Sequence, residues 1–387
     1  MTLSRRGVLT GALAAGLTVP LGFGGRAAAA GPVRLVLPAP TGPFPIGTVP
    51  LHLVDRSRPD PVRGPGYHRE LMISVWYPAH DAGRYPRDLW LSAESTRGLL
   101  ESADFPGDAA SPPFTAGRLG APVRRTGGRL PVVVYSHGAH DHRSDATIAV
   151  QELASHGYIV VTVDHTYDSY MEFPDGRIEV PVIADEHSLG ARDFADDIPF
   201  VLDRVEDLAA GRNPDVDGHP LPAGLRGAPD PRRIGMFGWS KGATATAWAM
   251  LGDRRIRDGL GLDGPMEPLV ETDLRRPFML MTAENTRDVP PVEQFWSHLT
   301  GWRLNVRADG AAHSSYVDHQ VLVPQLAAVT GMSDEELRDW IGTLDVGRAV
   351  RIQQAYPLAF FDLHLRDRRQ RLLEGPSRAF PEVRFVP

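Results

Sequence analysis

The chain has 387 residues, of which 42% are hydrophobic and 23% are charged, a balance typical of a globular enzyme rather than a disordered or collagen-like chain. Its formal net charge of −7 argues against a nucleic-acid partner, which requires a concentrated basic surface. The sequence has no cysteine, so disulfides, thiolate metal ligands and a thiol nucleophile are excluded.

The first thirty residues have the three parts of an export signal. Ser4-Arg5-Arg6-Gly7-Val8-Leu9 is a charged opening, an apolar run follows it, and Ala27-Ala28-Ala29-Ala30 ends the segment with small residues. The paired arginines indicate a twin-arginine signal. An N-terminal membrane anchor is disfavoured, because the apolar run is short and glycine-rich for a span of about 20 residues. We therefore expect a secreted protein whose mature part is 31–387.

Apolar strands alternate with helical patterns along the rest of the chain. Two opening antiparallel strands are predicted at 51–54 and 71–77, followed by strands at 131–136, 158–163, 233–237, 259–262, 278–281 and 304–306. Helices are predicted at 145–156, 194–208 and 243–250, from the capping box at 333–336, and at 346–366. Nearly continuous apolar strands separated by helices predict a mostly parallel sheet covered on both faces, in one catalytic domain.

The segment Gly238-Trp239-Ser240-Lys241-Gly242 carries the most informative motif. Gly-x-Ser-x-Gly has meaning only between a strand and a helix, and here strand 233–237 precedes it and helix 243–250 follows. The glycines relieve crowding at a sharp turn that presents the serine hydroxyl at the carboxyl edge of the sheet. An idle serine in a glycine-flanked turn is the alternative. The setting favours an α/β-hydrolase fold with Ser240 as nucleophile.

A serine hydroxyl needs a base to take its proton, and His313 is the predicted base. It follows strand 304–306 in a loop, which is the position of the base when the chain order is serine, acid, histidine. His319 is the near rival, but we expect it inside the next helix. His298 falls in a helical segment and is expected to be structural.

The acid that orients the imidazole has two candidate positions. Asp263 ends strand 259–262, whereas Glu284 and Asp288 follow strand 278–281, the commoner position in this fold. Both loops reach the same edge of the sheet, so spacing leaves the choice open. The tight Asp263-Gly264-Pro265 turn favours Asp263.

Two backbone N–H groups are expected to form the oxyanion hole. One belongs to Lys241, directly after the nucleophile, and the other to Ala139, in the loop after strand 131–136.

Two acidic or histidine-rich segments suggest metal sites only weakly. Asn213-Pro214-Asp215-Val216-Asp217-Gly218 begins like a calcium loop, but its twelfth position is Gly224 instead of the required glutamate. His140-Asp141-His142 lacks a third predictable ligand, and we expect it to be a solvated loop. We therefore expect no metal and no cofactor.

Taken together, the chain resembles the platelet-activating-factor acetylhydrolase family. The resemblance covers most of the mature chain and is carried by the segments 41–47, 55–60, 76–78, 133–138, 153–158, 163–165 and 238–242, with 262–264 and His313. It implies that the acid is the aspartate 23 residues after the serine, Asp263. It also implies a calcium-independent hydrolase of short-chain or oxidised acyl esters. Trp239 and Lys241 differ from the residues often found beside the serine in this family.

The expected activity is hydrolysis of a small-molecule or lipid ester through an acyl-enzyme, with transient contact with lipid surfaces left open. A peptidase or amidase of the same fold is the first alternative, disfavoured because the sequence shows no propeller-sized additional domain. A non-catalytic binding protein on a hydrolase scaffold is the second, disfavoured because serine, aspartate and histidine are all present.

Overall fold

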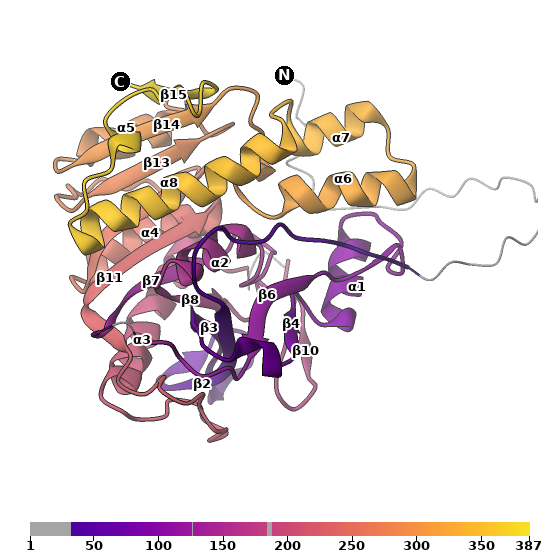
Figure 1. Ribbon diagram of the computed structural model, residues 1–387, viewed down its shortest axis with the longest axis vertical. Coiled ribbons are helices and arrows are strands. Elements are labelled where there is room, and N and C mark those ends of the chain that lie inside the picture. Colours follow the sequence, from indigo (N-terminus) through magenta and orange to yellow (C-terminus); the bar gives the residue numbers. More distant parts are fainter. Residues whose placement is uncertain (1–31, 126, 184–187) are drawn as a thin grey trace, which may run out of the picture.

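The computed structural model describes residues 32–125, 127–183 and 188–387, and one large sheet lies at its centre (Figure 1). Within these residues the sheet has 11 strands in the order β15-β14-β13-β12-β11-β7-β8-β3-β2-β6-β4. Their bounds are β2 Ile46–Asp60, β3 Gly64–Pro78, β4 Arg87–Leu89, β6 Phe114–Leu119, β7 Leu130–Ser136, β8 Ile159–Asp164, β11 Pro229–Trp239, β12 Ile256–Leu262, β13 Phe278–Thr282, β14 Arg303–Ala308 and β15 Val383–Val386. Two short pairs lie outside it, β1 Val33–Arg34 with β5 Ala110–Ser111 and β9 Met171–Glu172 with β10 Ile178–Glu179.

The strands from β8 to β14 are parallel, which confirms the predicted sheet. All residues of β7 are buried and both of its faces are covered, which explains why its sequence is a continuous apolar run. β2 and β3 pair antiparallel, as predicted, and β3 joins the sheet antiparallel to β8. The carboxyl ends of the parallel strands therefore share one edge.

Helices cover both faces of the sheet. One face carries α3 Ala191–Ala209, α4 Lys241–Gly252 and α5 Pro290–His298, and the other carries α2 Thr147–Ser155 and α8 Val346–Arg366 (Figure 1). Each face has its own cluster of buried apolar side chains, which joins these helices to the strands. Both faces of the sheet are thus covered by apolar side chains, and the edge at the strand ends is where a polar site can form.

A further group of helices lies at one end of the molecule. It comprises α1 Ala93–Ser102, α6 His319–Thr330 and α7 Asp334–Ile341, and α6 shares a buried apolar cluster with α1 (Figure 1). The predicted capping box at the start of α7 is confirmed, because the Ser333 side chain accepts from the Glu336 N–H and the Glu336 carboxylate accepts from the Ser333 N–H.

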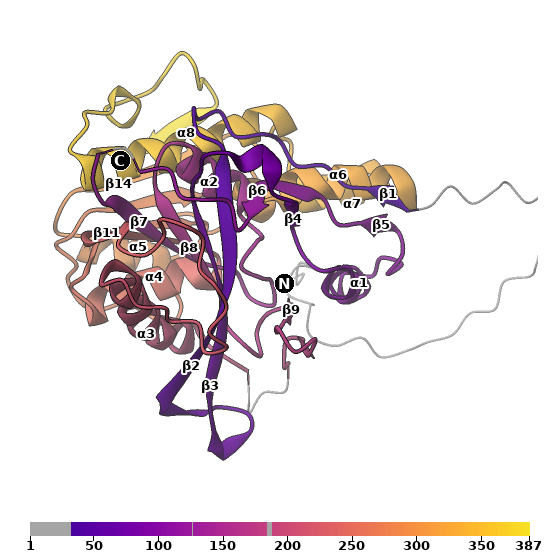
Figure 2. The same cartoon turned by 60° about the horizontal axis from the view of Figure 1, so that its bottom comes forward.

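The hairpin of β2 and β3 is much longer than the apolar pattern predicts (Figure 2). The predicted strands stop where the sequence becomes charged, between residues 55 and 70. In the structure this part of the hairpin is still paired, and many of its side chains are exposed at its tip. Periodicity detects burial, so it missed strand residues that have no core to face.

The predicted export signal at 1–30 lies outside the described residues. Among the residues that are described, no helix has both the length and the apolar character needed to cross a bilayer.

Candidate active site

Ser240 occupies the sharp turn between β11 and α4. Its backbone has φ 53° and ψ −118°, a conformation that side-chain-bearing residues rarely adopt. Its N–H donates to the Leu262 carbonyl at the end of β12 over 2.9 Å, which continues the hydrogen-bond ladder one residue beyond the strand. The turn therefore holds the hydroxyl at the carboxyl edge of the sheet.

The two glycines of the motif are required by close backbone contacts. A Cβ on Gly242 would lie 2.1 Å from the Ser136 carbonyl oxygen, and a Cβ on Gly238 would lie 2.2 Å from the Gly242 carbonyl oxygen. No side chain fits at either position, because backbone atoms cannot rotate away as a side chain can. The start of α4 is consequently packed directly on the end of β7.

His313 lies beside Ser240, as the sequence predicts. Its Nε2 is 3.0 Å from Ser240 Oγ, and its Nδ1 is 2.6 Å from an oxygen of Asp263. The indole N–H of Trp239 donates to the His313 carbonyl over 2.9 Å, and the two rings lie 4.8 Å apart. The imidazole is thus fixed by its backbone as well as by its ring partners.

Asp263 is fully buried, and donors other than His313 surround its carboxylate. Its Oδ1 accepts the N–H groups of Ala283 at 2.6 Å and Asn285 at 2.9 Å. The Asn285 amide also donates to the Asp263 carbonyl oxygen over 2.9 Å. These contacts leave Oδ2 aimed at the imidazole. Asn285 was not singled out from the sequence, although it follows Glu284 in the strand-end loop.

The rival acids and bases have other partners. Glu284 accepts the backbone N–H of His313 at 2.9 Å. His319 begins α6, as expected, and its Nε2 lies 3.3 Å from a carboxylate oxygen of Asp141. His298 ends α5 and pairs with Asp273 over 2.9 Å. The geometry therefore selects Asp263 and His313 as the partners of Ser240.

The two predicted oxyanion donors flank the contact between β7 and α4. Lys241 is the first residue of α4, and Ala139 lies in the loop that follows β7. Within the part of the chain that the structure describes, neither backbone N–H donates to a protein acceptor. Both amides are therefore available to a ligand, with the partial positive charge of the helix start behind one of them.

The loop from His137 to His142 is more buried than the sequence predicts. The predicted solvated loop at 140–142 is wrong, because Asp141 and His142 are buried. His142 packs edge-on against Trp90 with ring centroids 4.3 Å apart, and Asp141 pairs with His319. These partners lie far away in the sequence, so local polarity could not reveal the burial.

His137 holds the same loop from inside. Its ring is buried, with Nδ1 2.6 Å from the Gly138 carbonyl and Nε2 accepting the His165 N–H at 3.1 Å. Burial and, to a smaller extent, the neighbouring His165 lower the pKa of His137 to about 4. The ring is therefore neutral at pH 7, and its two hydrogen bonds serve to position the backbone next to Ala139.

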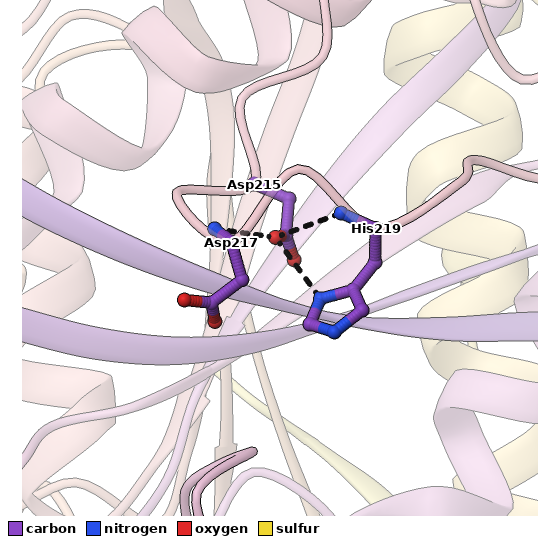
Figure 3. Close-up of side chains that lie close together, drawn as sticks. All are labelled: Asp215, Asp217 and His219. Atoms are coloured by element: carbon purple, nitrogen blue, oxygen red, sulfur yellow. Dashed lines mark hydrogen bonds and ion pairs between the residues drawn. The ribbon is translucent and has the colours of Figure 1, made fainter.

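The acidic loop after α3 contains the one group of potential metal ligands among the described residues. Asp215, Asp217 and His219 have ligand atoms within 4.8 Å of one another (Figure 3). One oxygen of Asp215 already accepts the Asp217 N–H at 2.9 Å and lies 3.3 Å from the His219 ring, while Asp217 pairs with His52. These hydrogen bonds hold the three residues together in an ordered turn.

A mostly parallel sheet with helices on both faces and a serine at a glycine-flanked strand–helix turn defines an α/β-hydrolase. Residues 31–172 match the family model described as "Platelet-activating factor acetylhydrolase, isoform II". Over these residues the chain resembles the platelet-activating factor acetylhydrolase family, which confirms the resemblance that its sequence motifs predict.

Relatives of known name agree with this resemblance. A probable 1-alkyl-2-acetylglycerophosphocholine esterase of Arthroderma benhamiae is 25% identical, over 92% of this chain and 95% of that one. The platelet-activating factor acetylhydrolase of Cavia porcellus is 22% identical, over 78% and 74% of the two chains. Among solved structures, a ferulic acid esterase from Streptomyces cinnamoneus superposes with a TM-score of 0.75 and 34% identity, over 91% of this chain and 99% of that chain. All three names support carboxylic-ester hydrolysis.

The contact between α4 and β7 gives a testable prediction. Gly242→Ala forces a Cβ onto the Ser136 carbonyl, and we expect overpacking to destabilise the protein by about 1–3 kcal/mol and to lower esterase activity. Gly252→Ala, at the other end of α4, meets nothing within 4 Å and is the matched control. Urea unfolding measures both variants, and equal stability of the two would contradict the steric account.

Proposed function

We propose that this protein is a secreted serine esterase that cleaves carboxylic esters through an acyl-enzyme. The observation that carries the proposal is the pair of contacts of His313, 3.0 Å to Ser240 Oγ and 2.6 Å to Asp263. Secretion through the twin-arginine signal at 1–30 is part of the proposal and rests on the sequence alone.

The mechanism follows from the proton positions. His313 Nε2 takes the Ser240 proton as the hydroxyl oxygen attacks the ester carbonyl, while Asp263 holds the imidazole through Nδ1–H. The amides of Lys241 and Ala139 bind the oxyanion of the tetrahedral intermediate. His313 then gives its proton to the leaving alcohol. Water repeats the sequence on the acyl-enzyme, and the acid and free Ser240 are released.

The proposed substrates are short-chain or phospholipid-type acyl esters. Two relatives support this class, since they are named for an acetylated alkyl glycerophosphocholine or for platelet-activating factor. No metal takes part in the proposed mechanism, because the chain's own donors can stabilise the developing charge.

A second substrate class is supported by a different observation. The structural neighbour with 34% identity over nearly its whole length is named a ferulic acid esterase. This identity exceeds that of the relatives named for acetylated phospholipids. Esters of aromatic hydroxycinnamic acids are therefore the second candidate.

Replacing the nucleophile tests the serine mechanism. Ser240→Ala removes the only group proposed to bond to the acyl carbon, so p-nitrophenyl acetate turnover is expected to fall by at least about 10⁴-fold while the protein stays folded. Initial rates, circular dichroism and labelling by a fluorophosphonate measure the outcome. Undiminished turnover in a folded variant would disprove the assignment.

The two carboxylates near His313 give a matched comparison. Asp263→Asn is expected to lower kcat by about 10³–10⁴-fold, because the amide no longer holds the correct imidazole tautomer. Glu284→Gln keeps an acceptor for the His313 N–H, so a loss below about tenfold is expected. A larger loss for Glu284→Gln than for Asp263→Asn would reverse the assignment of the acid.

A substrate panel separates the proposed classes. We expect kcat/KM for a 2-acetyl phospholipid and p-nitrophenyl acetate to exceed that for methyl ferulate by about tenfold or more. The opposite order would assign the protein to the second class. Faster cleavage of a p-nitroanilide amide than of the matched ester would contradict both.

A further inference from the structure

The oxyanion hole of the proposed esterase is built from two separate segments. Ala139 belongs to the loop after β7, whereas Lys241 begins α4. The two amides act together only if the distance between these segments is fixed. A side chain that contacts both segments can fix this distance.

Asp168 makes this connection. One oxygen of its carboxylate accepts the backbone N–H of His140 at 2.6 Å, next to Ala139. The other oxygen accepts the ammonium of Lys241 at 2.5 Å. Asp168 is fully buried, and the Lys241 side chain is only 17% exposed, so solvent and salt weaken this ion pair only slightly.

The connection extends to a third segment. The Lys241 ammonium also donates to the Leu189 carbonyl over 2.7 Å and lies 5.1 Å from the centre of the Phe194 ring in α3. Its direction is thus set on several sides. A lysine held in this way cannot swing into the site as a mobile cation, which leaves its backbone N–H as its contribution to the reaction.

The segment around Asp168 runs alongside the oxyanion loop. Ser169 forms a parallel bridge with Asp141, and the Tyr170 N–H donates to the Asp141 carbonyl over 3.1 Å. His140 has φ 59° and Tyr167 has φ 77°, both in the left-handed region that such residues seldom adopt. Strained backbone on both sides of the Asp168 contact persists only where the surroundings fix it.

We propose that Asp168 is the positioning residue of the oxyanion hole, acting through the Lys241 side chain and the His140 amide. The inference rests on the proposed serine mechanism. It gives Lys241 two roles, since its amide faces the oxyanion while its ammonium holds the helix start to the loop.

Two isosteric or near-isosteric variants and their combination test the connection. Asp168→Asn keeps an acceptor for His140 but loses the ion pair, and Lys241→Met keeps the backbone N–H but loses the ammonium. Each is expected to lower kcat for p-nitrophenyl acetate by about 10–100-fold, part of the 10²–10³-fold loss seen when an oxyanion donor is removed. KM is expected to change less than about twofold, because the contacts of Asp168 act on the transition state.

The double variant and a transition-state mimic separate positioning from general stability. Asp168→Asn with Lys241→Met is expected to fall within about threefold of the worse single variant, since both remove one connection. The inhibition constant of phenylboronic acid, which forms a tetrahedral anion on serine, is expected to rise in parallel with the loss of kcat/KM. Asp253→Asn, which breaks an ion pair with Arg255 just after the far end of α4, is the control and is expected to keep kcat within about twofold.

Several outcomes would overturn the proposal. Unchanged kcat in either folded variant, losses that multiply in the double variant, or lowered thermal midpoints with normal kcat and boronate inhibition would each do so. If Asp168→Asn does not fold, Lys241→Met alone decides by the same criteria. Fluorophosphonate labelling of Ser240 in the wild-type protein keeps the two proposals distinct. A failure to label would count against the serine mechanism and not against the positioning role of Asp168.

Discussion

The direct contact between two stretches of backbone is the constraint on which the site depends. Gly242 lies so close to the Ser136 carbonyl that α4 has only one way to leave β11. The same contact packs the start of α4, which carries the Lys241 amide, against the end of β7, which the loop with the Ala139 amide follows. Ser240 is held at positive φ, at a cost of about 1–3 kcal/mol, because its neighbours leave no room for a relaxed turn.

The parallel part of the sheet and most of the site could be predicted from the sequence. Strands buried on both faces give continuous apolar runs, and β7 is entirely of this kind. The motif around Ser240 and the position of His313 after a strand follow from the chain order of such sites. The choice between Asp263 and Glu284 could not follow from spacing, because both loops end at the same edge. Their difference lies in direction, toward the imidazole ring in one case and the backbone in the other.

The buried polar contacts around the site could not be predicted. Asp141 and Asp168 sit in segments that look like ordinary polar loops. Each is buried by a partner distant in the sequence, His319 and Lys241 respectively. A buried charge such as that of Asp168 is tolerated in the interior only when paired, whereas burial raises the pKa of Asp141 and lowers that of His319, so their contact joins neutral groups. Contacts across such separations leave no local signal in the sequence.

Backbone hydrogen bonds extend the sheet beyond its last strand residues to Ser240 and Asp263. The Ser240 N–H is bonded to the end of β12, and the Asp263 N–H to the Met281 carbonyl of β13 over 2.8 Å. Ser240 and Asp263, the proposed nucleophile and acid, are therefore positioned by the sheet and not by the loops that continue from them. Insertions within 265–277, or within 286–302 beyond the Asn285 contacts, can change the segments that follow while Ser240 and Asp263 keep their places. Selectivity and chemistry can thus diverge independently on this scaffold.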